Sequence, residues 1–281
     1  MIGIEAPRGT ATVAGAPGSG VLEVVRRGRQ SIVTRAMATS PLRLLTPRNH
    51  GGGAWIYAGT YGGGLVDGDA LRLEVSVGPH AAAMLSTQAS TKVYRSRGTT
   101  VDLDAVVASG GLLAVLPDPV ICFAASSCRQ TQRVKLNAGA SLILVDWLTS
   151  GRHAAGERWR FDRYASRIEV QDGSRLVMMD SLSLDAAEGN LDARMGRFNV
   201  LCLIALVGPS VREHAERVLS QVASVPVVRR ARLLAGASAV ADGGCLVKIA
   251  GVSLEEVASA ARDYLRFVPS LLGDDPWARK W

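Results

Sequence analysis

The chain has 281 residues, a net charge of +7, an aromatic content of only 5% and four cysteines. Its length is sufficient for a substantial hydrophobic core. Most of the excess positive charge lies in residues 1–50, which contain seven arginines and two acidic residues, Glu5 and Glu23. Because aromatic residues are sparse and no nucleic-acid motif occurs, we expect no nucleic-acid partner. The longest apolar run, residues 200–207, is too short to span a bilayer, so no membrane association is expected.

The cysteines and the N-terminus indicate the compartment. Cys122, Cys128, Cys202 and Cys245 show neither a C-x-x-C spacing nor the pattern of a disulfide framework. The N-terminus lacks the charged-then-apolar layout of a secretion signal. We therefore expect a cytoplasmic protein with reduced thiols. Residues 1–20, rich in Gly, Ala, Pro and Thr, are predicted to be disordered, and residues 21–281 to form a single domain.

The first predicted elements form a weak internal repeat, in which an alternating strand, a glycine turn and a second apolar strand recur. The four copies span residues 71–85, 101–116, 134–145 and 168–179. Their turns lie roughly thirty residues apart, a period typical of stacked β units that share one core. The sequence therefore predicts a mainly β fold, a single layered β-helix-like stack of strands. The alternative is a β-sandwich whose hairpins happen to be regularly spaced.

Residues 61–96 are the most distinctive segment of the chain. Gly62 to Gly64 allow backbone angles that a side chain would forbid, and Asp67-Gly68 favours a tight hairpin turn. Residues 71–77 then alternate with the period of a half-buried strand. The block 86–96 is rich in hydroxyl groups, so it either lines a wet interior or docks a partner.

Beyond Asp180 the apolar period changes from two to 3.6. Capping boxes at residues 210–213 and 253–256 predict the two α-helices that we expect in the C-terminal third. Between these helices, strands near residues 231–240 and 245–249 are joined by a hairpin turn at residues 242–244. No stretch with the composition of a linker separates this part from the rest.

Acidic residues near turns are the candidates for chemistry, because no catalytic motif is present. Asp67, Asp69, Asp118, Asp146 and Glu157 are dispersed, and scattered carboxylates bind divalent cations weakly. For any single one of these residues, the favoured interpretation is a turn cap or an arginine partner. The enzymatic alternative is a hydrolase or transferase site assembled from Asp146, His153 and Glu157.

Six segments together resemble the family of urease accessory proteins called UreD, or UreH in some lineages. The motifs occupy residues 40–47, 62–69, 86–96, 116–120 and 146–157, followed by the Arg-Lys-Trp end. They cover the chain in order from about residue 22 to residue 281, which is more specific than any single motif. The sequence of residues 145–153 is most similar to that of the plant and fungal branch.

This resemblance implies a non-catalytic scaffold that binds apo-urease together with UreF and the GTPase UreG. It further implies a water-filled tunnel that conveys nickel, no tightly bound cofactor beyond transient Ni²⁺, and a dimer of heterocomplexes. Matching of family motifs makes Asp69, Ser90, Lys92, Asp118 and Glu157 candidate tunnel residues. Asp67, Asp69, His153 and Glu157 are the candidates for transient metal contacts.

Overall fold

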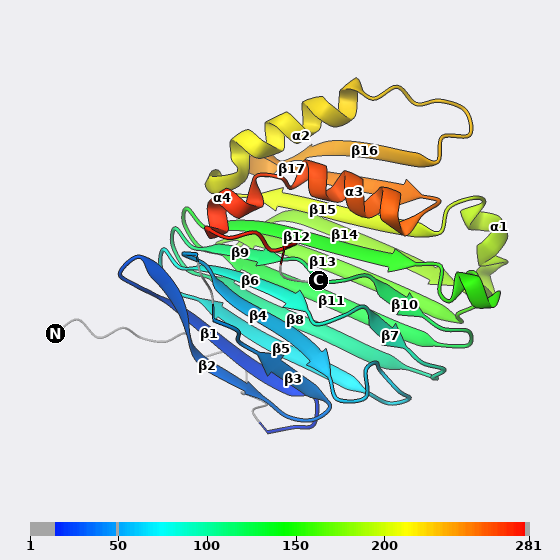
Figure 1. Ribbon diagram of the computed structural model, residues 1–281, viewed down its shortest axis with the longest axis horizontal. Coiled ribbons are helices and arrows are strands. Elements are labelled where there is room, and N and C mark those ends of the chain that lie inside the picture. Colours follow the sequence, from blue (N-terminus) through cyan, green and yellow to red (C-terminus); the bar gives the residue numbers. More distant parts are fainter. Residues whose placement is uncertain (1–14, 49–50, 279–281) are drawn as a thin grey trace.

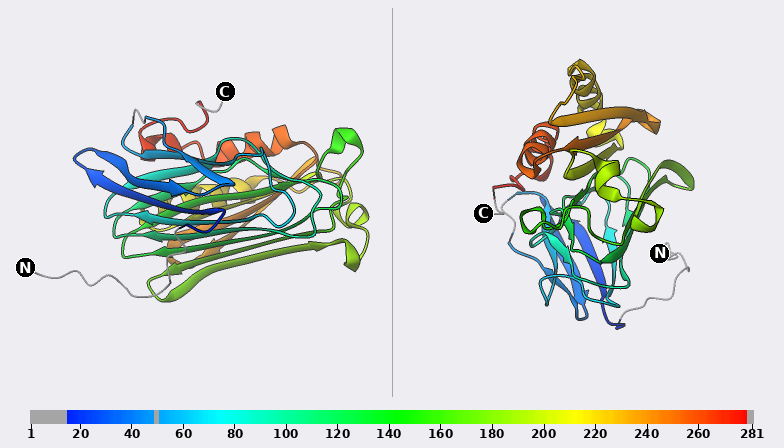
Figure 2. Two further views of the ribbon diagram at one scale, coloured as in Figure 1. Left: turned by 90° about the horizontal axis from the view of Figure 1, so that it is seen from below. Right: turned by 90° about the vertical axis from the view of Figure 1, so that its right-hand side faces the viewer.

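The computed structural model describes residues 15–48 and 51–278, and two β-sheets stacked face to face make up most of this part of the chain (Figures 1 and 2). Within the described residues, sheet A has the strand order β14 (Arg175–Asp185), β13 (Arg163–Asp172), β11 (Ser127–Leu136), β8 (Thr99–Val107), β5 (Ala70–Val77), β1 (Ser19–Arg27) and β2 (Gln30–Ala38). Sheet B has the order β16 (Leu233–Val240), β17 (Gly244–Gly251), β15 (Val200–Val207), β12 (Ser141–Thr149), β9 (Leu112–Val115), β6 (Ala82–Thr87), β4 (Ala54–Thr60) and β3 (Leu42–Leu45). Two short strands, β10 (Val120–Cys122) and β7 (Thr91–Val93), extend sheet B beside β12.

The central strands form a β-helix-like coil, as the repeat predicted. The chain passes from β5 in sheet A to β6 in sheet B, back to β8, and so on through β9, β11 and β12 to β13. Successive strands within each sheet are therefore parallel, as in β5–β8–β11–β13 and in β6–β9–β12. Glycines make the tight crossings possible, because Gly110 and Gly139 adopt φ of 66° and 74°. The coil is not closed, and antiparallel strands flank it in both sheets.

The fourth copy of the repeat was predicted wrongly. Residues 168–179 do not cross between sheets but form an antiparallel hairpin, β13–β14, inside sheet A. Asp172 pairs with Arg175, so only Gly173 and Ser174 remain for the turn. A two-residue connection closes a hairpin, whereas each of the crossings β5–β6, β8–β9 and β11–β12 between the sheets takes four residues.

Two predictions for the N-terminal part need correction. Ser19 and Gly20 are not disordered, because they are buried in β1 and pair with Arg72 and Leu73 of β5. The prediction for residues 1–14 lies outside the described residues. The turn at Asp67-Gly68 is not a hairpin, since it joins β4 in sheet B to β5 in sheet A.

The helices of the described residues lie in the C-terminal third; α2, α3 and α4 cover the outer face of sheet B, whereas α1 lies at one end of the stack (Figures 1 and 2). The two longer helices are α2 (Arg212–Ser224) and α3 (Leu254–Tyr264), and the two shorter are α1 (Leu191–Met195) and α4 (Val268–Leu272). Single 3₁₀ turns occur at η1 (His153–Ala155), η2 (Ala186–Glu188), η3 (Pro209–Val211) and η4 (Ala241–Gly243).

The capping boxes located the helices but not their caps. Ser210 lies inside η3, and α2 begins only at Arg212. Ser253 is the N-cap residue of α3, but its side chain caps nothing. The predicted C-terminal hairpin is confirmed by the antiparallel pairing of β16 with β17.

Side chains on the facing surfaces of the two sheets form the main core. Leu142 and Leu144 of β12 point into it, whereas Ile143 and Val145 point to the helices on the other face of sheet B. This alternation makes every second residue of β12 part of the inter-sheet space. The same alternation decides which polar side chains of these strands point into the space between the sheets.

Leu144→Ala should lower the free energy of unfolding by about 2–5 kcal/mol, because it leaves a cavity between the sheets where the leucine is fully buried. Urea denaturation followed by circular dichroism measures the change. Leu176→Ala is the matched control, since that side chain is 51% exposed at the edge strand β14, and its cost should stay below about 0.5 kcal/mol. Equal losses in both variants would contradict the assignment of the core.

Candidate functional site

A belt of polar side chains divides the inter-sheet core in two. One apolar cluster includes Leu144, the other includes Leu148, and Asp146 lies between them on the inward face of β12. Gln130 and Gln132 on β11 take inward positions between Cys128 and Val134, which belong to the two clusters. These polar side chains therefore interrupt the apolar core in the space between the two sheets.

Asp146 is held by partners from the opposite sheet. Its Oδ1 accepts a hydrogen bond from Nε2 of Gln130 at 2.8 Å, and its Oδ2 accepts one from the Ser166 hydroxyl at 2.6 Å. Gln130 lies on β11 and Ser166 on β13, both in sheet A, whereas Asp146 lies in sheet B. The carboxyl group therefore joins the two sheets through two side-chain hydrogen bonds, one to each oxygen.

Two cavities share Asp146 as a lining residue. Cavity 1, of about 200 Å³, extends towards β4, β6 and β8, and cavity 2, of about 500 Å³, extends towards β14, β16 and β17. Asp146 and the adjacent Trp147 line both. The six waters of a hydrated divalent cation fill roughly 180 Å³ of liquid at ~30 Å³ each, which is within the volume of either cavity.

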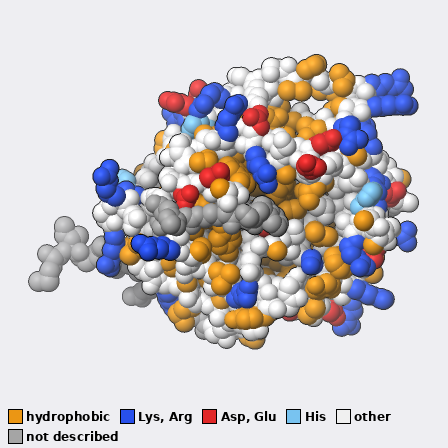
Figure 3. Space-filling view, in the orientation of Figure 1, with side chains coloured by type: hydrophobic (Ala, Val, Ile, Leu, Met, Phe, Trp, Pro, Cys, Tyr) orange, Lys and Arg blue, Asp and Glu red, His pale blue; other side chains and the backbone are white. Residues whose placement is uncertain are grey.

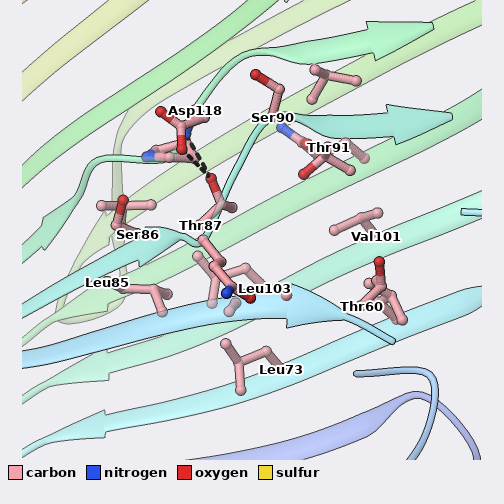
Figure 4. Close-up of a pocket in the computed structure, with 18 of the residues that line it drawn as sticks. Thr60, Leu73, Leu85, Ser86, Thr87, Ser90, Thr91, Val101, Leu103 and Asp118 are labelled. Atoms are coloured by element: carbon pink, nitrogen blue, oxygen red, sulfur yellow. Dashed lines mark hydrogen bonds between the residues drawn. The ribbon is translucent and has the colours of Figure 1, made fainter. Parts of the chain in front are cut away.

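Cavity 1 has a wall of hydroxyl groups from the segment 86–96 (Figure 4). Ser86 donates to the carbonyl oxygen of Leu116 at 2.6 Å, and the Thr87 hydroxyl accepts from the backbone N–H of Asp118 at 2.7 Å. Ser90 and Thr91 lie further along the same wall (Figure 4). Of the two interpretations of this block, a wet interior wall is the one that the cavity favours.

Burial controls the charge of Asp146. Asp146 is half-buried and lines both cavities. Burial raises the pKa of Asp146, and the nearby carboxylate of Asp180 raises it further. The hydrogen bonds from Ser166 and Gln130 oppose this shift by stabilising the ionised form.

The candidate tunnel residues from the family motifs fall in different places. Ser90 and Asp118 line cavity 1. Asp69, Lys92 and Glu157 line neither cavity 1 nor cavity 2. The Asp69 carboxylate instead closes its own turn by accepting from the backbone N–H of Val66 at 2.8 Å.

Glu157 and Asp67 form arginine ion pairs near the surface. Glu157 pairs with Arg152 and accepts from the backbone N–H of Ala124 at 3.2 Å, and the bonds from Arg152 and then Ala124 lower the pKa of Glu157. Asp67 accepts from the backbone N–H and the guanidinium of Arg97, and these bonds lower the pKa of Asp67. Both carboxylates therefore have the partners that a structural role requires.

The structure does not bring Asp146, His153 and Glu157, the residues of the enzymatic alternative, into one site. Asp146 lies between the sheets, whereas His153 is exposed in η1 and Glu157 is bonded to Arg152 on the connection that follows β12. Neither His153 nor Glu157 lines a cavity with Asp146. The three residues are neighbours in sequence only.

Sequence reasoning missed four residues around the cavities: Gln130, Ser166, Asp180 and Lys248. Strand parity contained part of the signal, because Gln130 and Ser166 occupy inward positions of alternating strands that are otherwise apolar. For Asp180, the wrongly predicted crossing placed its strand in the other sheet. No pattern in the sequence predicts that Lys248 pairs with Asp180.

These features define a class of protein: two stacked sheets with cavities between them that polar side chains partly line. In the part of the chain that the structure describes, no three or more His, Cys, Asp or Glu side chains are grouped so that they could hold a metal ion. Among the same residues, no helix has the length and apolar character needed to cross a membrane.

Comparison with known proteins assigns the family. Residues 16–281 match the model of the UreD urease accessory protein family. The chain is 51% identical over 269 residues to the urease accessory protein UreD of Sorangium cellulosum, covering 95% of this chain and 86% of that protein. It is 33% identical over 305 residues to urease accessory protein D of rice (Oryza sativa subsp. indica), covering 98% and 99%. A ureD-like protein of Schizosaccharomyces pombe is 32% identical over 205 residues, covering 67% and 70%. The chain belongs to the UreD family of urease accessory proteins.

Asp146→Asn should stabilise the protein at neutral and alkaline pH. Because the folded state holds this proton more tightly than the unfolded chain, the wild-type protein loses stability as the pH rises from below the ordinary value of 3.8 through the raised pKa of Asp146. The amide cannot ionise, so the advantage of the variant should grow with pH and disappear below about pH 4. Urea denaturation of both proteins from pH 4 to pH 8 measures it, and a difference that does not depend on pH would contradict the burial of an ionisable Asp146.

Proposed function

We propose that this chain is a non-catalytic maturation scaffold that conveys nickel to urease. In this proposal it acts in the cytoplasm in a complex with UreF and the GTPase UreG, binds apo-urease, and passes Ni²⁺ from the GTPase towards the urease active site. Membership of the family supports association with urease and other accessory proteins. A dimer of such heterocomplexes is compatible with the proposal.

The observation that carries the proposal is that Asp146 lines two cavities. In this proposal an ion that enters cavity 1 at the hydroxyl wall passes to cavity 2 beside Asp146 and Trp147, the residues that line both cavities. Passage requires that a site bind the ion weakly enough to release it. Oxygen ligands that leave most of the hydration shell in place meet this requirement, whereas a cluster of thiolates would retain the ion.

The cysteines of the interior are consistent with transport rather than storage. Cys128 lines cavity 1, but burial raises its pKa to about 11, so the thiol remains protonated at physiological pH. A protonated thiol is a poor ligand, because the thiolate is the form that binds metals. Cys128 therefore does not compete with Asp146 for a passing cation.

Ser166→Leu should block the passage without preventing assembly. The larger apolar side chain would fill and dewet the space beside Asp146, and urease activation in a reconstituted system should fall by roughly tenfold or more. Co-purification with the accessory partners checks that the complex still forms. Ser183→Leu is the matched control, because Ser183 is exposed on β14 and points away from the core.

Two outcomes would contradict the proposal. Urease activation that is unchanged when the protein is omitted would exclude a maturation role. Equal activation with Ser166→Leu and Ser183→Leu would exclude passage by this route. Loss of assembly in Ser166→Leu would make Ser166 a structural residue.

A further inference from the structure

An ion pair closes the open edge of the two-sheet stack at cavity 2. Lys248 of β17 in sheet B pairs with Asp180 of β14 in sheet A, and both residues line the cavity. The Asp180 side chain is only 13% exposed, whereas the Lys248 side chain is 60% exposed. The ammonium group therefore reaches inward from solvent to a carboxylate that belongs to the interior.

Asp180 faces the same space as Asp146. It occupies an inward position on β14, between Met178 and Leu182, and its charge contributes to the raised pKa of Asp146. Tyr164, a residue that is 1% exposed, also lines cavity 2, and its buried hydroxyl group has no hydrogen-bond partner among the described residues.

The residues that line cavity 2 include more acidic than basic side chains. Its wall carries two carboxylates, an unsatisfied hydroxyl group and the Ser166 hydroxyl, all of which are oxygen ligands suited to a hydrated divalent cation. Among the described residues that line it, Lys248 is the one basic side chain. An unpaired Asp180 carboxylate in this position would attract and retain a cation.

We propose that Lys248 is a displaceable plug: its ammonium group occupies the cation position at Asp180 while cavity 2 is empty and gives way when a divalent cation arrives. A doubly charged ion attracts the carboxylate more strongly than a single ammonium charge at the same distance. The flexible four-carbon stem of lysine lets the head group swing into solvent. The inference rests on the proposed function for the identity of the cation, Ni²⁺.

The plug has a consequence for the affinity of the site. Each cation that binds at Asp180 must first displace the ammonium group, so the net affinity of cavity 2 is lower than its ligands alone would give. This competition prevents the cavity from becoming a trap. It also keeps the Asp180 carboxylate neutralised in the absence of metal, which stabilises its partly buried charge.

Titration of the purified protein with Ni²⁺, in complex with accessory partners where solubility requires them, tests the plug. Lys248→Met should bind Ni²⁺ roughly tenfold more tightly than wild type, because the competing charge is gone. Lys248→Arg, which keeps the charge, should bind like wild type. Adding Asp180→Asn to Lys248→Met should abolish the gain.

Arg232→Met is the matched control for the loss of a surface cation. Arg232 pairs with Glu256, is 64% exposed, and lines neither cavity 1 nor cavity 2. Its replacement should leave Ni²⁺ affinity unchanged. Equal affinity of wild type and a folded Lys248→Met variant would overturn the proposal, as would an equal gain in Arg232→Met.

A second measurement uses the wild-type chain and does not depend on the folding of a variant. Acylation by an amine-reactive ester, quantified by peptide mass spectrometry, should modify Lys248 several-fold faster when Ni²⁺ is present, whereas Lys92 and Lys135 should react at unchanged rates. An unchanged rate at Lys248 under saturating Ni²⁺ would refute displacement. Urease activation is scored separately: tighter Ni²⁺ binding by Lys248→Met with unaltered activation would preserve the plug and count against the proposed delivery route.

Discussion

The alternation of the chain between two stacked sheets is the constraint on which the rest of the structure depends. The strands alternate between the two sheets in the order β5, β6, β8, β9, β11, β12 and β13. Each sheet therefore grows by parallel pairing, and every second side chain of a strand points into one shared interior. Residues 16 or 20 positions apart in the chain thereby become neighbours across a single space. Gln130, Asp146 and Ser166 meet for this reason alone.

The polar belt around Asp146 interrupts a core that would otherwise be continuous. Burying a carboxyl group is costly unless hydrogen bonds satisfy it, and here Gln130 and Ser166 supply one bond to each oxygen. The belt separates the two inter-sheet clusters and leaves cavities on both sides. Apolar side chains of similar volume would make a core at least as stable, so stability alone does not account for the polar belt.

How far the sequence predicted the site depended on the range of the contacts involved. The hydroxyl-rich block 86–96 was singled out from composition, and Ser86 to Thr91 do line cavity 1. Asp118 and Ser90 were also placed among the candidates and lie in that wall. Asp69 and Glu157 were chosen on the same grounds, yet local backbone groups and an arginine satisfy them. Composition identifies polar residues in strands and turns, but it does not specify which face of the sheet they occupy.

The sequence by itself determined the family, the β repeat and the two longer helices, because motif order, strand alternation and the helical period are local properties of the chain. Only the tertiary structure decided that residues 168–179 form a hairpin, since a two-residue turn and its pairing partner outweigh a repeat pattern. It also decided that Asp146, Asp180 and Lys248 share one cavity. Their proximity arises from pairing between strands and stacking between sheets, and such long-range contacts leave no periodic trace in the sequence.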